Sequence, residues 1–449
     1  MTAETWSSRV AFYFVSIGAA VGLGTLWRFP YLAGQYGSAF IVVFVLVCAL
    51  ITTPILAAEF MLGRSGRGSP PAATRAVALA SGGSSRWSII GWLGTAAIVA
   101  IMAYYSVIGG WVLAYAGTFA TGDLAGAGAE EVGRRFAALL ADPWALTFWH
   151  FAFMAITVAI SAAGLQRGIE LANKIMIPGL FALMLGLVAY AFATGDLERG
   201  VPFVFRSDWS QIDADLLLAA VGQAFYATGV GMAIMMAYGA YVPSGVSLLR
   251  SGAVISASIV VASILASLII FPLAFRFEVD PAQGPELAFV VLPAIFTHMP
   301  GGQIAGFAFF ILLAFAALSS AIAGLEPPAA VLRERFGVSR RASVSIVGAA
   351  MWLAGLPVVL SFNLWSELRP LAGIPRYAGY GIFEIMDYTA ANLLLPIGAL
   401  LTCIFVAWRL PDSTLSDQLE LGDGRRRTYR RLLGWLCAPA ILLLFVMNL

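Results

Sequence analysis

Long apolar runs separated by short polar segments extend along the whole chain. A helix that crosses a bilayer needs about 20 mostly apolar residues, because each residue rises about 1.5 Å through roughly 30 Å of hydrocarbon. The runs also lack the alternation typical of membrane-spanning strands. The pattern predicts an all-α polytopic membrane protein with eleven transmembrane helices, over residues 8–32, 37–62, 88–118, 144–163, 171–194, 214–241, 250–275, 303–332, 342–361, 379–409 and 432–448.

Composition and charge support a single transmembrane domain over 1–449. Hydrophobic residues make up 60% of the chain and charged residues 11%, against about 45–50% and about 25% in soluble domains. A net charge of +2 excludes the basic surface of a nucleic-acid-binding protein, so the expected partners are the lipid bilayer and a small molecule. The cysteines Cys48, Cys403 and Cys437 lie inside apolar runs and predict neither a disulfide nor a zinc site.

Basic residues are distributed unequally between alternate loops. With a cytoplasmic N-terminus, the inner loops hold 17 Lys and Arg residues and the outer loops hold 7. Cytoplasmic loops carry the excess of positive charge in membrane proteins. We therefore expect a multi-pass protein of the cell inner (plasma) membrane, with the N-terminus in the cytoplasm and, after an odd number of spans, the C-terminus outside.

Glycine-rich segments interrupt the first and sixth spans, at 18–25 and 226–231. Inside a bilayer such an interruption is expected only where the freed backbone faces a cavity or a ligand, and the half-helix ends can hold a cation and an anionic group. For either run alone, close helix packing is the alternative. Both runs start a five-span half, 8–194 and 214–409, which favours an inverted-repeat transporter. The last span, 432–448, is then an additional helix.

Residues around these breaks resemble the neurotransmitter:sodium symporter (NSS) family. The similar positions follow the chain in order: Trp6, Arg9, 18–24, 27–31, 37–40, Glu59, Tyr104, Tyr105, Trp111, 167–170, Pro178, 222–226 and 318–320. The resemblance implies the LeuT-type fold, a 5+5 inverted repeat with broken helices 1 and 6, in the shorter eleven-helix bacterial form. It also implies sodium-coupled symport by alternating access rather than an enzyme, and the chain lacks a catalytic motif or a GxxxxGK[ST] nucleotide loop.

By the same resemblance, one sodium site is kept and another is degenerate. The family's second sodium site would consist of the carbonyls of Gly18, Val21 and Ala316 and the hydroxyls of Ser319 and Ser320. These oxygens are hard ligands, which suit sodium. Alone, a serine pair more often bonds its own helix backbone. The first sodium site would have Thr25, Ala227 and Ile259 in place of its side-chain ligands. In the chloride site Phe44 replaces a tyrosine, although Gln223 and Ser263 remain. We therefore expect one Na⁺ and no chloride.

The resemblance also predicts a substrate site for a neutral, bulky hydrophobic amino acid. Gly22 would leave room for a carboxylate near Leu23, Gly24 and Tyr105. Carbonyls of the two breaks would receive the ammonium. Gly324 would enlarge the cavity, with ordinary close helix packing as the alternative. The predicted substrate residues are Ala19, Ala20, Gly22, Leu23, Gly24, Ile101, Tyr105, Tyr226, Ala227, Gly229, Met232, Ser320 and Gly324.

Charges within spans predict gates, since a charge there is costly and so needs a function and a partner. Arg28 and Asp387 match the family's outer gate, with Tyr226 as the lid. Trp6, Tyr241 and Glu334 match inner-gate residues, and Arg9 is the candidate for the missing basic residue. These gates argue against the alternative function, a membrane amino-acid receptor or sensor that does not transport.

The sequence also supports predictions for four further side chains and for one helix segment. Gly168 and Pro178 could let the fifth helix unwind. Glu59 and Glu326 are expected to bond backbone groups freed at the breaks, and His150 and His298 to be solvated or capping residues near helix ends. We expect a monomer or a weak homodimer.

Overall fold

The structure is a computed structural model that describes residues 4–206, 209–279 and 287–447, and all regular elements in these ranges are helices. The membrane-length elements are α1 (Arg9–Ala20) with η1 (Gly24–Arg28) and α2 (Phe29–Tyr36), α3 (Ser38–Val47) with η2 (Cys48–Thr52) and α4 (Thr53–Gly66), α6 (Ile89–Thr121), α8 (Pro143–Ala162), η4 (Leu165–Glu170) with α9 (Leu171–Thr194), α11 (Ala214–Thr228) with α12 (Ile234–Gly239), α13 (Leu248–Arg276), α15 (Gly302–Phe336), α16 (Arg340–Ser361), α17 (Ile382–Tyr388) with η8 (Thr389–Leu394) and α18 (Leu395–Trp408), and α20 (Asp423–Arg431) with η9 (Leu432–Cys437) and α21 (Ala438–Met447).

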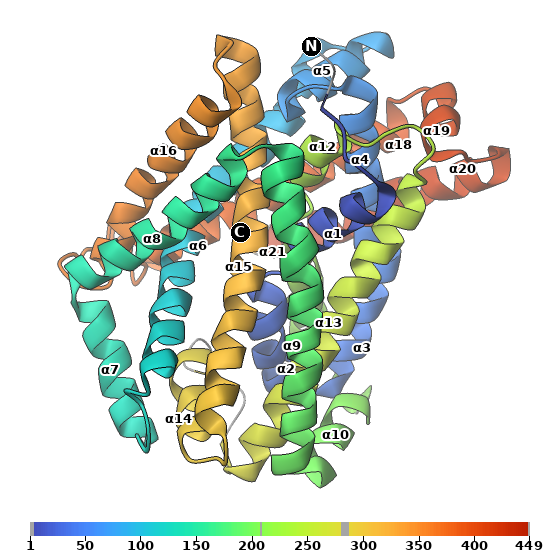
Figure 1. Cartoon of the computed structure of the whole chain (residues 1–449). Helices are drawn as coiled ribbons and strands as arrows, with labels where there is room; N and C mark the ends of the chain where they lie inside the picture. The colour runs from blue at the N-terminus through green and yellow to red at the C-terminus, as the bar shows by residue number, and fades with distance from the viewer. Residues whose placement is uncertain (1–3, 207–208, 280–286, 448–449) are drawn as a thin grey trace.

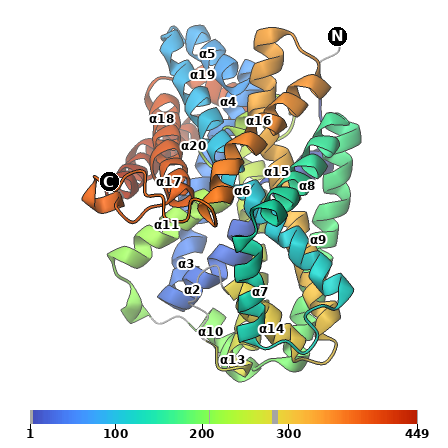
Figure 2. The same ribbon diagram turned by 90° about the vertical axis from the view of Figure 1, so that its left-hand side faces the viewer.

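Short helices cap the two ends of this bundle (Figures 1 and 2). One end carries α5 (Pro70–Ala80) and α19 (Asp412–Leu419), and is called the α5 end. The other carries α7 (Ala129–Ala141), α10 (Leu197–Phe205) and α14 (Leu292–Thr297), and is called the α14 end. The remaining short turns are η3 (Ser85–Ser88), η5 (Trp209–Gln211), η6 (Leu287–Val291) and η7 (Pro375–Tyr377).

The count of spans is close to the eleven predicted. In the described residues, nine helices are long and apolar enough to cross a membrane, and α1 with η1 and α2 forms a tenth span that is bent by 58°. The remaining predicted span, 214–241, which is the sixth in chain order, corresponds to the two short helices α11 and α12. The fold is therefore an all-helical membrane bundle with broken first and sixth spans.

Burial separates central helices from peripheral ones. The spans of α6 and α15 are each 78% buried within the protein, whereas those of α8, α9 and α21 are 33% buried. Figure 1 shows α15 running through the middle of the bundle, between α6 on one side and α9 and α13 on the other. The two most enclosed helices therefore flank the broken spans, while the peripheral helices offer apolar surface to lipid.

The last span begins earlier than predicted, at Asp423 rather than near residue 432. An aspartate in the first turn and arginines in the last turn of α20 complement the helix dipole. Arg430 also donates to the carbonyls of Ala407 and Leu410 at the end of α18. Residues 423–431, which lie between the predicted spans 379–409 and 432–448, thus form a helix that docks on the neighbouring span.

His150 contradicts the expectation of a solvated or capping residue. Its side chain is fully buried, and its Nε2 lies 2.9 Å from the Ser106 hydroxyl. Gly355 allows this close packing, because a Cβ there would lie 2.5 Å from the imidazole Cε1. His298, in contrast, is exposed, with Nδ1 2.9 Å from the Ala294 carbonyl, as expected for a capping residue.

The break between α11 and α12 is held by a side chain from another helix. Gly229 and Gly231 have φ of +67° and +84°, a conformation that glycine adopts without strain. The Gly231 amide donates to Glu59 Oε1 at 2.7 Å, and Glu59 is fully buried. This confirms the expectation that Glu59 bonds freed backbone.

Glu59→Leu should therefore destabilise the protein by about 1–3 kcal/mol, since it leaves a buried amide without an acceptor. Glu59→Gln keeps an acceptor oxygen and should lie much closer to the wild type. Thermal unfolding of the detergent-solubilised protein measures both. Equal midpoints for the Leu and Gln variants would contradict this role of Glu59.

Candidate functional site

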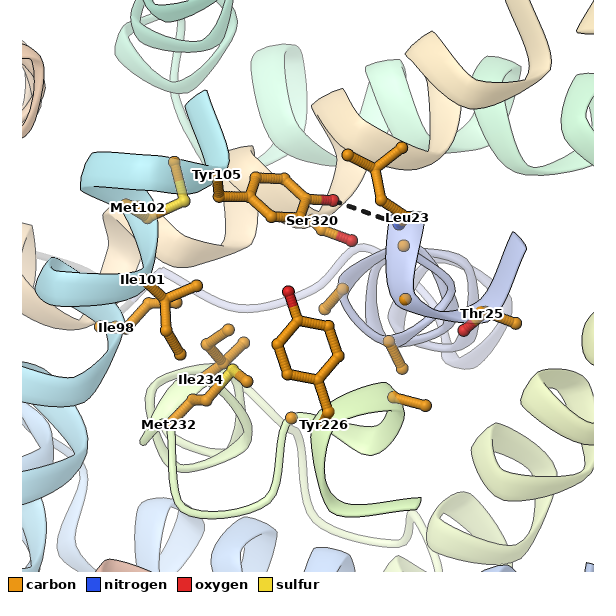
Figure 3. A pocket seen from close by; sticks show the side chains of 16 residues that line it. Leu23, Thr25, Ile98, Ile101, Met102, Tyr105, Tyr226, Met232, Ile234 and Ser320 are labelled. Atoms are coloured by element: carbon orange, nitrogen blue, oxygen red, sulfur yellow. Dashed lines mark hydrogen bonds between the residues drawn. The ribbon is translucent and has the colours of Figure 1, made fainter. Parts of the chain in front are cut away.

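A central cavity lies where the two broken spans meet. It encloses about 50 Å³, and Figure 3 shows the hydroxyls of Tyr105, Tyr226 and Ser320 on one side and apolar side chains on the other. The lining includes no charged side chain. It consists of Ala19, Ala20, Gly22, Leu23, Gly24, Thr25, Ile98, Ile101, Met102, Tyr105, Tyr226, Ala227, Gly229, Met232, Ile234 and Ser320.

Glycines in the first break leave space that other residues would fill. A Cβ on Gly22 would lie 2.7 Å from Ser320 Oγ and 3.1 Å from the Tyr105 hydroxyl oxygen. A Cβ on Gly24 would lie 2.6 Å from the Tyr226 ring. The Leu23 amide donates to the Tyr105 hydroxyl at 3.4 Å, so this end of the cavity presents hydrogen-bonding groups from backbone and side chain.

The cavity brings together all the predicted substrate residues except Gly324. That glycine lies behind the lining, where a Cβ would meet Met102 Sδ at 2.9 Å and Ile98 Cδ1 at 3.3 Å. Its small size therefore serves close helix packing, the alternative considered above. A larger residue would act on the cavity only by displacing Met102 or Ile98.

The lining also includes Thr25, Ile98, Met102 and Ile234, which the sequence did not place among the substrate residues; Thr25 was assigned only to the degenerate sodium position. Ile98 and Met102 are spaced with Ile101 and Tyr105 at i, i+3, i+4 and i+7 along α6, which places the four on one helix face. That spacing is the signal that could have found two of the four. Ile234 follows the second break directly, where periodicity offers no such guide.

Gly18, Ala316, Ser319 and Ser320 of the predicted sodium site lie together near the end of α1, and Val21 follows Gly18 as the C-cap of that helix. Ser320 donates to the Gly18 carbonyl at 3.2 Å, across two helices that are far apart in sequence. Ser319 donates to the Ala316 carbonyl of its own helix at 3.1 Å and is fully buried. Hydroxyls and carbonyls are hard oxygen ligands, so the donor set fits a sodium ion.

The degenerate positions lie on the other side of the first break. Thr25 and Ile259 are fully buried, and Phe44 packs against Phe29 with ring centroids 4.7 Å apart. Gln223 Nε2 donates to the Gly24 carbonyl at 2.7 Å and so caps this break. The oxygens Thr25 Oγ1, Gln223 Oε1 and Ser263 Oγ are buried without hydrogen bonds in the described part of the chain.

A second cavity of about 200 Å³ lies toward the α14 end of the central one. Both cavities are lined by Leu23, Gly24, Tyr105 and Tyr226. Arg28 and Asp387 line this outer cavity, and the Arg28 guanidinium carbon lies 4.9 Å from the Tyr226 ring centroid, a cation–π contact.

Arg28 and Asp387 are not among the pairs that approach within 4.0 Å in the described residues. The two charges that could close the outer cavity are therefore apart. Tyr226 is one of the four residues that lie between the central and the outer cavity.

A charged network closes the α5 end. Glu326 is 1% exposed and pairs with Arg333 at 2.7 Å and with Arg340 at 2.6 Å. Tyr241 donates to the same carboxylate at 2.6 Å. Glu326 was expected to bond freed backbone, but two guanidinium groups neutralise a buried carboxylate more completely than amides do.

Trp6 and Tyr241 take part in this closure and Glu334 does not. Trp6 Nε1 donates to the Tyr238 carbonyl at 3.2 Å, and its ring meets Tyr241 edge-on at 5.7 Å. Glu334 is exposed and accepts from the Ser69 amide at 2.8 Å. The gate prediction for Glu334 is therefore corrected, because its side chain holds the turn before α5 instead.

The N-terminal segment contributes an acid to the network rather than the expected base. Glu4 lies 3.3 Å from Arg340 and 3.6 Å from Arg333. Arg9 is exposed, and its Nη2 lies 3.5 Å from the position of a Cβ on Gly245, so it does not replace the missing basic residue here.

A mostly apolar cavity with hydrogen-bonding groups at two helix breaks, closed at one end and adjoining a larger cavity at the other, is the arrangement expected of a secondary transporter. The sequence profile described as "Sodium:neurotransmitter symporter family" matches residues 3–131 and 143–449. The chain belongs to this family, and is a sodium-dependent symporter rather than an enzyme.

Individual relatives span nearly the same length. The chain is 33% identical to the uncharacterized sodium-dependent transporter YhdH of Bacillus subtilis, over 98% of this chain and 96% of that protein. It is 29% identical to an uncharacterized sodium-dependent transporter of Haemophilus influenzae, over 99% and 98%. The crystal structure of MhsT in complex with L-phenylalanine superimposes with a TM-score of 0.90, at 36% identity, over 99% of this chain and 100% of that one. The LeuT-type fold is thereby confirmed.

Glu326→Gln should weaken the closure at the α5 end, since it removes the charge that holds two arginines. We expect a reporter cysteine at Ala19, in the cavity wall, to react about tenfold faster with a membrane-impermeant thiol reagent applied from that end, a change of about 1.4 kcal/mol. The three native cysteines are buried. Glu130→Gln is the matched control, because its pair with Arg134 is exposed at the other end. Equal rates for both variants would contradict the closure.

Proposed function

We propose that this symporter carries a neutral, bulky hydrophobic amino acid by alternating access, with one sodium ion per substrate and without chloride. The observation that carries the proposal is the central cavity, which has hydrogen-bonding groups at the helix breaks, apolar side chains elsewhere and no charged lining residue. A zwitterion fits such a site, since the half-helix ends offer partial charges of both signs. The L-phenylalanine held by MhsT supports the same class of substrate.

The substrate's two charged groups would bind at opposite sides of the breaks. The carboxylate would accept hydrogen bonds near Leu23 and Gly24 and from the Tyr105 hydroxyl, in the space that Gly22 leaves open. The ammonium group would donate to carbonyls at Ala20, Tyr226 and Ala227. The hydrophobic side chain would then lie against Ile101 and Met232.

A single sodium ion would bind between α1 and α15. Its ligands would be the carbonyls of Gly18, Val21 and Ala316 with the hydroxyls of Ser319 and Ser320. The two serines already bond carbonyls of this set. The apolar Ala227 and Ile259 offer no side-chain oxygen for a second ion, and Phe44 offers no donor to chloride.

Orientation follows from the charge distribution. With the positive charge inside, the α5 end is cytoplasmic and the α14 end faces outward in the plasma membrane, with the C-terminus outside. In this orientation Trp6 with Tyr241 would form an inner gate that is closed, and Arg28 with Asp387 would form an outer gate whose two charges are apart. We propose that the five-helix repeats 8–194 and 214–409 move relative to each other, in a monomer or weak homodimer.

Proteoliposome uptake tests this function against the alternative of a receptor or sensor that does not transport. Labelled L-phenylalanine should accumulate under an inward sodium gradient. Its rate should rise hyperbolically with sodium, with a Hill coefficient near one, and should not change when gluconate replaces chloride. Ser320→Ala should weaken sodium and substrate binding together, because coupling is reciprocal. Binding of the amino acid without accumulation in wild-type vesicles would favour the receptor.

Asp387→Ala should reduce uptake by about tenfold, because the outer gate loses a charge-assisted contact of about 1.5–3 kcal/mol. Asp123→Ala makes the same change at an exposed position near the α14 end and should leave uptake unaltered. Initial rates at matched protein density in the vesicles measure both. Wild-type rates in Asp387→Ala would remove the gate assignment.

A further inference from the structure

Asn173 stands out as a buried polar side chain next to the proposed sodium site. It lies in α9, within the segment between Gly168 and Pro178, and is fully buried. Its amide oxygen Oδ1 has no hydrogen bond in the part of the chain that the structure describes. An unsatisfied buried oxygen is costly, which indicates that this atom has a partner in another state of the protein.

The orientation of the amide follows from its other contact. Asn173 Nδ2 lies 2.9 Å from the Ile169 carbonyl. A carbonyl only accepts hydrogen bonds, so the NH₂ group must face it. The oxygen therefore points away from Ile169, toward α1.

The oxygen faces the region where the ion ligands converge. The position that a Cβ on Gly18 would occupy lies 2.1 Å from Asn173 Oδ1 and 3.0 Å from Ser319 Cβ. Gly18 is also the residue whose carbonyl accepts from Ser320. Residues of three helices, α1, α9 and α15, thus meet around Gly18.

We infer that Asn173 Oδ1 is a further ligand for the sodium ion, bound to it directly or through one water molecule, so that ion binding extends to α9. The inference rests on the proposed sodium site. An amide oxygen is a hard, neutral ligand of the kind that suits sodium, and an ion or its water would satisfy the oxygen that lacks a partner.

This contact would link the ion to the helix segment next to the α5 end. Asn173 Nδ2 donates to the Ile169 carbonyl in the π-helix η4. The next residue, Glu170, pairs with Lys174 at 2.6 Å and accepts a hydrogen bond from the Ser7 amide at 3.0 Å. With sodium bound, α9 is held against α1. When sodium leaves, α9 loses this link and can open.

Sodium titration of the purified full-length protein in detergent tests the inference, with thermal midpoint as the readout and choline keeping the ionic strength constant. Asn173→Ala removes the oxygen. Asn173→Ser keeps a donor to the Ile169 carbonyl but is too short to reach the ion. Both should raise the apparent sodium dissociation constant by about tenfold, as loss of a supporting metal contact does.

Thr157→Ala is the matched control, because Thr157 is also fully buried and donates to the carbonyl four residues earlier, at 2.8 Å, but in α8. It should leave the sodium constant unchanged. In amide hydrogen exchange, sodium should slow exchange over 168–178 in the wild type and not in Asn173→Ala.

The outcomes separate this inference from the proposed function. Loss of the sodium response in Ser320→Ala, with a wild-type sodium constant in both Asn173 variants, would overturn the inference and leave the sodium site standing. If the thermal midpoint of the wild-type protein does not change with sodium concentration, both the proposed sodium site and this inference are overturned.

Discussion

The structure depends on how backbone groups are satisfied where two helices stop inside a membrane. The bilayer core offers no water to an unpaired amide or carbonyl, and each one left alone costs several kcal/mol. Two side chains from other elements meet that need: Glu59 at Gly231 and Tyr105 at Leu23. Gln223 adds a second donor to the Gly24 carbonyl, which also accepts from the Phe29 amide. These contacts make the breaks permanent features of the fold, and so keep polar backbone available to a solute at the centre of an apolar bundle.

The two ends of the cavity use different interactions. At the α5 end, Glu326 is buried with two arginines, and such a pair is stable only while its geometry is kept. At the α14 end, Arg28 lies over the Tyr226 ring and apart from Asp387. Opening the first end therefore requires the buried Glu326, Arg333 and Arg340 to separate or to become hydrated, whereas no such ion pair joins Arg28 and Asp387 at the second end in the described residues. This asymmetry gives alternating access a physical basis in this chain.

Much of this architecture is predictable from the sequence, because the bilayer imposes one length on every span and permits breaks only at special places. The eleven spans, both breaks and almost all the lining of the central cavity follow from that constraint together with the family resemblance. Gly324, placed behind Met102, shows its limit, since a glycine that faces a cavity and one that faces a neighbouring side chain look alike in sequence.

The charged contacts were harder to predict for a related reason. Glu326 and Glu334 are eight residues apart on α15, and only the packing of α16 and the N-terminal segment decides which one meets the arginines. Burial of His150 likewise depends on Gly355, about 200 residues away. Contacts between distant segments, rather than local pattern, determined most of the corrections.

The central claim is that one sodium ion, held at the end of α1, accompanies each amino acid. The most direct test is the reversal potential of substrate flux in proteoliposomes, measured as the sodium gradient is varied at a fixed amino-acid gradient. We expect a shift that corresponds to one sodium ion and one net charge per substrate. A shift that corresponds to two sodium ions would contradict it, and would show that Thr25, with the oxygens of Gln223 and Ser263, rebuilds a second ion site.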